Sequence, residues 1–221
     1  MPNPLLSIFD ALYAYYGPRN WWPAETPLEV CVGAILTQNT NWINVEKAIA
    51  NLKQGDLLSV NSLNEASLER LADAIRPSGY YNIKARRVKA FVEWLYVGYG
   101  GSLENMFATG LYQLREELLG VHGIGRETCD SILLYAGNQP TFVVDAYTGR
   151  LFSRLGLISG DCGYENIRRI FMEGLPRDAQ LFNEYHALIV HHCKVFCRKR
   201  PLCSGCLLRE RCKEGRDGSS N

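Results

Sequence analysis

Apolar residues recur at intervals of three and four along most of this chain, which is the spacing of one face of an α-helix. Short clusters of Gly, Pro and Asn separate these segments and are typical of helix ends. Only one stretch, residues 141–144, has the pattern of an extended segment. We therefore predict an all-α fold. The predicted helices cover residues 28–36, 45–52, 68–75, 88–96, 111–119, 132–136, 146–155, 167–175 and 187–195.

Composition narrows the class of protein. The chain has 221 residues, of which 47% are apolar, and its formal net charge is +1. It can therefore bury a substantial core, and any nucleic-acid contact must depend on where the charges lie. We find neither an N-terminal signal pattern nor an apolar run near the roughly 18 residues that would span a bilayer. We expect a cytoplasmic protein without a membrane partner.

Four cysteines stand close together near the C-terminus, in a Cys-x5-Cys-x2-Cys-x5-Cys array at Cys197, Cys203, Cys206 and Cys212. Thiolates bind zinc or iron–sulfur clusters, and this short tail has too little apolar sequence to fold without such a link. Residues 191–216 also carry eight Lys and Arg against two Glu, which suits a phosphate backbone. Cys193 could be a fifth ligand, although its place near a helix end favours packing.

Two further features could carry chemistry. Gly123 and Gly125 lie between two predicted helices, where they allow a tight turn with positive φ and leave the amides of the second helix open to a phosphate. A plain helix–helix turn would have the same pattern. Asp145 follows the extended stretch and precedes a helix, and capping of that helix would be enough to explain it.

Taken together, the glycine hairpin, the aspartate and the cysteine array resemble the endonuclease III superfamily of helix–hairpin–helix DNA glycosylases. The resemblance covers most of the chain and implies a two-lobed fold. One lobe would span residues 28–137 and contain the hairpin, the second would combine 1–27 with 138–196, and a cluster loop would follow at 197–212. The resemblance implies a [4Fe–4S] cluster on the four cysteines. Zinc stays an alternative, because the family has six residues between its first two ligands and this chain has five.

The resemblance also implies roles for two acidic residues. Asp145 matches the catalytic aspartate of the family, which stabilises the sugar cation and activates water. Glu127 stands where the bifunctional members have a lysine, and a carboxylate cannot form a Schiff base. We therefore expect a glycosylase without AP lyase activity. Glu127 could also be an ordinary exposed helix residue.

The motifs Trp21-Trp22-Pro23 and Gln38-Asn39-Thr40-Asn41-Trp42 resemble the 3-methyladenine DNA glycosylase III branch of the family. The implied base pocket consists of Trp21, Trp22, Pro23, Trp42 and Glu127. Aromatic faces suit an alkylated purine, which is electron-poor and often cationic. Tryptophans are also common core residues, so a structural role would explain them as well.

The partner implied by the resemblance is double-stranded DNA with a damaged base, bound by a monomeric enzyme of base excision repair. Gln38 and Tyr80 match the two wedge positions that fill the space left by the base, and the hairpin residues Gly123, Ile124, Gly125 and Arg126 would contact the backbone. Three alternatives stay open. They are a glycosylase for mismatched adenine, thymine or uracil, an endonuclease III-like glycosylase/AP lyase, and a non-catalytic iron–sulfur DNA-binding module.

Overall fold

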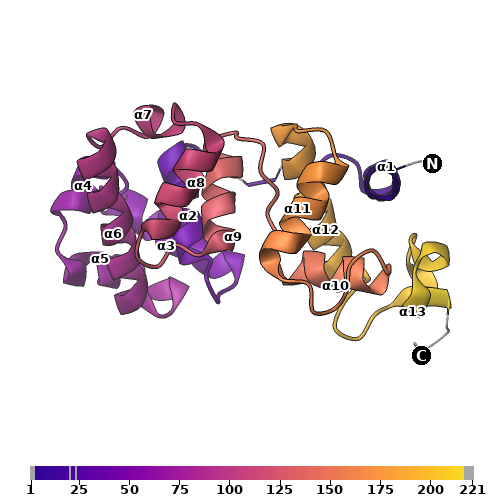
Figure 1. Cartoon of the computed structure of the whole chain (residues 1–221). Coiled ribbons are helices and arrows are strands. Elements are labelled where there is room, and N and C mark those ends of the chain that lie inside the picture. Colours follow the sequence, from indigo (N-terminus) through magenta and orange to yellow (C-terminus); the bar gives the residue numbers. More distant parts are fainter. Residues whose placement is uncertain (1–2, 20, 23, 217–221) are drawn as a thin grey trace. The chain divides into compact units, whose positions relative to one another are not determined.

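The computed structural model describes residues 3–19, 21–22 and 24–216, and the chain divides into two compact units (Figure 1). Unit 1 comprises residues 1–21 and 140–221, and unit 2 comprises residues 22–139. The described residues form helices and turns without a strand, which confirms the all-α prediction. None of the described helices is long and apolar enough to cross a membrane.

Unit 2 is built around α6 (Tyr81–Tyr99), whose inner face is buried from Ala85 to Leu95. Ser and Thr caps begin several of its shorter helices, because their side-chain oxygens accept the first free helical amides. The other helices are α2 (Pro27–Leu36), α3 (Trp42–Gln54), α4 (Val60–Glu65), α5 (Leu68–Ala74), α7 (Leu103–Phe107), α8 (Leu111–Gly120) and α9 (Arg126–Ser131). A π-helical turn at Ile132–Ala136 prolongs α9, and a 3-10 turn occupies Arg76–Ser78.

A buried lysine ties α6 to α2. The Lys84 side chain is 1% exposed, and its Nζ donates to the carbonyl oxygens of Leu36 at 2.8 Å and Ser78 at 2.6 Å. Burial, with a smaller effect of nearby Arg87, lowers the pKa of Lys84 to about 8. The amine therefore works as a hydrogen-bonded link inside unit 2 rather than as a surface cation.

Unit 1 has an aromatic core. Phe142 stacks on Phe171 with ring centroids 3.9 Å apart, and Phe152 and Tyr185 pack edge-on around them. This core lies among α10 (Ala146–Arg154), α11 (Tyr164–Gly174) and α12 (Ala179–Val195). The C-terminal loop adds 3-10 turns at Cys203–Gly205 and Arg209–Arg211, and the short helix α13 (Lys213–Arg216).

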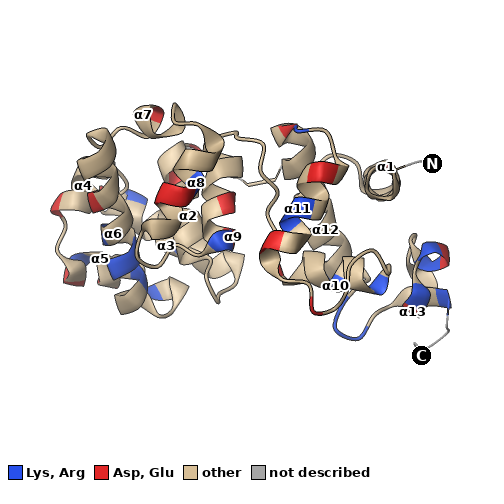
Figure 2. Ribbon diagram, viewed as in Figure 1, with Lys and Arg blue, Asp and Glu red and all other residues tan. Residues whose placement is uncertain are grey.

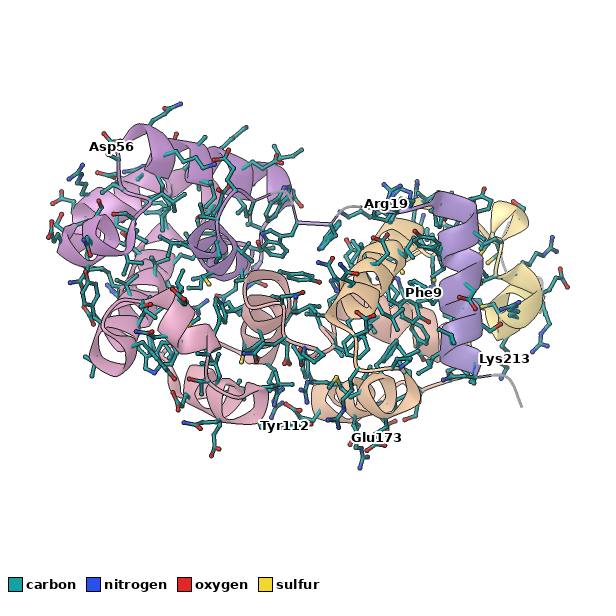
Figure 3. All side chains as sticks on the ribbon, turned by 90° about the horizontal axis from the view of Figure 1, so that it is seen from above. Phe9, Arg19, Asp56, Tyr112, Glu173 and Lys213 are labelled. Carbon is teal, nitrogen blue, oxygen red and sulfur yellow. The ribbon has the colours of Figure 1, made fainter. Side chains whose placement is uncertain are left out.

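The first helix, α1 (Pro4–Tyr16), was not among the predicted helices, and it packs on α12. Figure 3 shows Phe9 pointing from α1 toward α12, where its ring meets Tyr185 edge-on at 5.2 Å. The Tyr185 hydroxyl donates to the Leu5 carbonyl oxygen at 2.7 Å. A buried hydrogen bond thus joins the two separate chain segments of unit 1.

The border between the units differs from the predicted lobes. Residues 22–27 belong to unit 2, whereas the sequence placed them with the N-terminal segment. The reason is Trp22, whose ring stacks on Tyr135 at 4.9 Å and meets Trp42 at 5.0 Å. Trp22 has a φ of +71°, an unusual value for a bulky residue, at the point where the chain passes from one unit to the other. The predicted cluster loop falls within unit 1.

Candidate functional site

Asp145 is the N-cap of α10 and is held from two sides. Its Oδ1 accepts hydrogen bonds from the Thr148 amide at 2.8 Å and the Thr148 hydroxyl at 3.0 Å. Its Oδ2 lies 3.5 Å from His186 Nε2, and the carboxylate side chain is 12% exposed. Burial by itself raises the pKa of Asp145, but the interactions with His186 and Thr148 outweigh it, so the pKa lies below its ordinary value. Asp145 is therefore both a helix cap and an oriented, ionised carboxylate.

Trp21 lies in unit 1 beside His186. Its indole meets the His186 ring edge-on, with centroids 6.4 Å apart, and Lys194 Nζ lies 5.9 Å from the indole centroid. Trp21 therefore contacts His186, the residue that approaches Asp145, whereas Trp22 packs inside unit 2. His186 did not figure in the sequence analysis, because nothing in the pattern of α12 distinguishes it from the other histidines there.

In unit 2, α8, residues 121–125 and α9 form the expected helix–hairpin–helix. Gly123 has a φ of +85°, whereas Gly125 has an ordinary φ of −88°, so only the first glycine meets the expectation of positive φ. The N-cap residue of α9, Gly125, makes no side-chain capping hydrogen bond, and the amides at a helix N-terminus are suited to an anion. Arg126 is exposed at this end, but Ile124 is 4% exposed and its side chain packs in the core. Ile124 could reach DNA only through its backbone.

Gln38 is bound to the hairpin. Its side-chain amide donates to the Gly123 carbonyl oxygen at 3.0 Å and to the Thr128 hydroxyl at 2.9 Å, and its carbonyl oxygen accepts from Arg87. The predicted wedge residue therefore also links α6 to the hairpin. The second wedge candidate, Tyr80, is 69% exposed and has a φ of +48° at the start of α6. Its ring is accessible to a partner.

The two hairpin glycines should differ in their tolerance of alanine. A Cβ on Gly123 would lie 2.2 Å from the Arg87 Cγ at a φ that alanine disfavours, whereas one on Gly125 would meet no atom within 4 Å. We expect Gly123→Ala to lower the free energy of unfolding by about 1–2 kcal/mol. Gly125→Ala should change the free energy of unfolding by about 0.5 kcal/mol at most, in either direction. Denaturant titration of both variants measures this, and equal losses would contradict the described hairpin.

An ion pair joins α8 to α9 behind the hairpin. Arg115 Nε donates to Asp130 Oδ1 at 2.9 Å, and Arg115 Nη2 donates to Asp130 Oδ2 at 3.0 Å. The Asp130 side chain is fully buried, and that of Arg115 is 13% exposed. This bidentate pair holds the two hairpin helices together with the geometry that guanidinium and carboxylate favour. Its partners are 15 positions apart, and no sequence pattern indicates the pair.

A cavity of about 260 Å³ lies on unit 2, with Trp22 and Trp42 in its wall. Because these two rings contact each other edge-on, no slot for a base is open between them. Charged side chains that the sequence analysis missed complete the wall. Lys53 pairs with Glu25 at 3.1 Å and Glu29 at 2.9 Å, and Trp42 Nε1 donates to Glu46 at 2.8 Å. Three carboxylates against one ammonium leave the wall with a negative balance.

Two other residues of the predicted base pocket are not found in the wall of this cavity. Glu127 is exposed in the first turn of α9 and does not line this cavity. Its negative charge suits a helix N-terminus, which is enough to explain the residue. Pro23 lies outside the described residues. The structure thus brings together Trp22 and Trp42 of the predicted base pocket.

The four cysteines of the C-terminal loop line one cavity in unit 1. Arg154 contacts this loop closely, with its Nη1 3.4 Å from Cys197 Sγ and its Nε 2.5 Å from Glu214. Among the described residues, no three His, Cys, Asp or Glu side chains stand close enough to hold a metal ion as they are. The donor set and its common cavity fit a thiolate-bound group. Cys193 does not line this cavity, but its thiol is hydrogen-bonded to Cys197 and also contacts the Tyr147 carbonyl oxygen.

Exposed basic side chains cover the same loop. Figure 2 shows Lys and Arg gathered on the segment that follows α12 and around α13. The exposed members are Lys194, Arg198, Lys199, Arg200, Arg209, Arg211, Lys213 and Arg216. Such a surface is suited to phosphate groups.

Comparisons with known proteins agree with this fold. Residues 32–177 match the family described as HhH-GPD superfamily base excision DNA repair protein. A protein of Methanocaldococcus jannaschii, provisionally named DNA repair glycosylase MJ1434, is 51% identical over 94% of this chain and 95% of its own length. Endonuclease III of Sulfolobus acidocaldarius is 29% identical over 86% of this chain and 83% of its own.

Solved structures show the same relation. The crystal structure of H. pylori 3-methyladenine DNA glycosylase (MagIII) bound to 1,N6-ethenoadenine has a TM-score of 0.76 and 30% identity, over 86% of this chain and 97% of that one. A non-covalent endonuclease III–DNA complex has a TM-score of 0.83 at 22% identity, over 96% of this chain and 95% of that one, and shows the fold alone. The family match, the relatives and the fold together establish that the chain belongs to the HhH-GPD superfamily of base excision DNA repair glycosylases.

Proposed function

We propose that this chain is a monofunctional DNA glycosylase that hydrolyses the N-glycosidic bond of alkylated purines such as 3-methyladenine. The observation that carries the proposal is the cavity of unit 2, where two indoles stand beside three carboxylates. An alkylated purine is flat and often cationic, so aromatic faces and negative charge attract it together. The 30% identical H. pylori relative, a 3-methyladenine DNA glycosylase, supports the same substrate class.

In this proposal Asp145 acts on the sugar. The N-glycosidic bond breaks with both electrons leaving on the base, and the ionised carboxylate stabilises the positive charge on the sugar. A water oxygen then bonds to the anomeric carbon, and its proton passes to Asp145. A cationic base leaves as a neutral molecule and needs no proton donor. The lowered pKa of Asp145 keeps the carboxylate in the form that this step requires.

Lyase chemistry needs a lysine that can attack the sugar, and the two lysines of unit 2 described above are both held in other interactions. Hydrogen bonds to Glu29 and Glu25 raise the pKa of Lys53, which holds its ammonium protonated and non-nucleophilic. Lys84 is buried and donates to two carbonyl oxygens. Glu127 occupies the hairpin position at which the bifunctional members of the family carry a lysine, and a carboxylate cannot form the Schiff base that lyase chemistry needs.

The proposal includes a [4Fe–4S] cluster held by Cys197, Cys203, Cys206 and Cys212, which line one cavity. When bound, such a cluster crosslinks a loop that has little apolar sequence of its own. The loop would then present its basic side chains to the DNA backbone. Iron and acid-labile sulfide in the purified protein would support the cluster, whereas stoichiometric zinc without iron would replace it.

The test is release of free bases, resolved by chromatography, from duplex DNA treated with a methylating agent. We expect 3-methyladenine in the soluble fraction and no strand cleavage. Parallel duplexes with mismatched adenine, thymine or uracil address the other glycosylases of the superfamily. Base release from the mismatched or uracil-containing duplexes alone would contradict the assignment to alkylated purines. Covalent trapping of the enzyme on DNA by borohydride would show a Schiff base and contradict the assignment as a monofunctional glycosylase. DNA binding without release of any base would favour a non-catalytic module.

A further inference from the structure

His186 of α12 approaches the proposed catalytic carboxylate, and the proposed function gives it no role. Its Nε2 lies 3.5 Å from Asp145 Oδ2, and its side chain is 7% exposed. The two residues come from different helices, and their contact forms where α10 packs on α12. Among the described residues, His186 is the basic side chain within ion-pair distance of Asp145.

The two carboxylate oxygens of Asp145 have different neighbours. Oδ1 takes both donors of Thr148, the amide and the hydroxyl, so that both of its lone pairs are engaged. Oδ2 is therefore the oxygen available to the sugar or to water. Because the carboxylate is mostly buried, it would tend to take up a proton unless a positive or hydrogen-bonding group faces it. His186 Nε2 stands at that oxygen.

We propose that His186 is a positioning residue that fixes Oδ2 of Asp145 and keeps the carboxylate ionised, so that base release continues under acidic conditions. This inference rests on the proposed function, in which Asp145 is the catalytic carboxylate. The other titratable groups on the packed elements are more distant influences. Arg150 of α10 and Asp145 both lie near the Cys193 thiol of α12, Lys194 faces Trp21, and Asp10 of α1 lies near Tyr185.

The first test is the pH profile of single-turnover base release between about pH 3 and 9. Without His186, burial would raise the pKa of Asp145, so we expect His186→Leu to move the acid limb upward by about 1–3 pH units. The loss of rate should be largest at the acid end and shrink toward pH 9. His186→Gln, which keeps a hydrogen-bond donor but removes the imidazole, applies the same criterion if the leucine variant does not fold.

His191→Gln is the matched control, because His191 lies on the same helix and contacts Tyr16 instead. It should keep the wild-type profile. An unshifted acid limb in the His186 variants, or an equal loss of rate at every pH, would overturn the inference.

A second readout does not depend on activity. Carbon-13 NMR of labelled aspartate carboxyls, with Asp145→Asn to assign the resonance, gives the pKa of Asp145 directly. We expect a higher pKa in His186→Leu than in the wild type. An unchanged pKa would overturn the inference even if bases are released. If the wild type released no base at all, the proposed function would fail, and this titration would still decide whether the two side chains are coupled.

Discussion

Asp145→Asn is expected to lower the rate of base release by about 10²–10⁴-fold without lowering affinity for DNA. The variant removes the negative charge that stabilises the sugar cation and the oxygen that takes the proton of water. Asparagine is as good a helix cap as aspartate, so α10 should keep its hydrogen bond to the Thr148 amide. Single-turnover release of 3-methyladenine, measured with equilibrium DNA binding, separates chemistry from recognition.

Asp145→Ala provides the matched comparison. It removes the cap as well as the charge, so it should lower the free energy of unfolding by about 1 kcal/mol, whereas Asp145→Asn should leave it almost unchanged. Both variants should be equally inactive. Substantial release of base by the folded asparagine variant would mean that the residue is a helix cap and no more.

Asp130→Ala is expected to have the largest effect on stability, a loss of about 3–5 kcal/mol in the free energy of unfolding. The variant leaves the Arg115 guanidinium without the carboxylate that it binds through two nitrogens, in a site where Asp130 is fully buried. The hairpin helices α8 and α9 would lose the ion pair that joins them. Denaturant unfolding followed by circular dichroism measures the loss.

Asp73→Ala is the control, because Asp73 pairs with Arg76 at the surface, where both side chains are more than half exposed. Exposed pairs contribute about 0–1 kcal/mol, so this variant should be nearly neutral. The double variant Arg115→Ala/Asp130→Ala should lose less than the sum of the two single changes, because no unpaired charge remains buried. Similar effects of Asp73→Ala and Asp130→Ala would contradict the description of a buried clamp.

The sequence predicted most of the fold because its helices repeat apolar residues with a clear period. Helices α2, α3, α8, α10 and α12 all overlap predicted segments. The helices that were not predicted have weaker local signals. α4 and α7 are six and five residues long and depend on the serine caps Ser59 and Ser102. α1 is longer, but it is held by Tyr185, a contact partner far along the chain.

The candidate site was predictable only where a motif carries it. The hairpin glycines, Asp145 and the cysteine array could be read from residue types and spacing. The side chains that tune the site could not, because helix packing decides which residues meet. His186 reaches Asp145 through the contact of α10 with α12, and Glu46 reaches the indole of Trp42 from one turn along α3. The adjacent Trp21 and Trp22 separate into different units, which no local pattern specifies.

The passage of the chain through unit 1, then unit 2, then unit 1 again has a consequence for its synthesis on the ribosome. Unit 2 is continuous in sequence and can begin to fold as soon as residue 139 has emerged. α1 must wait for α12, since the hydrogen bond between Leu5 and Tyr185 spans 180 positions. At about 5–20 residues per second, that delay is roughly 10–40 seconds. During this interval the apolar stripe of α1 has no native partner, so a chaperone that binds nascent chains would find its target in α1.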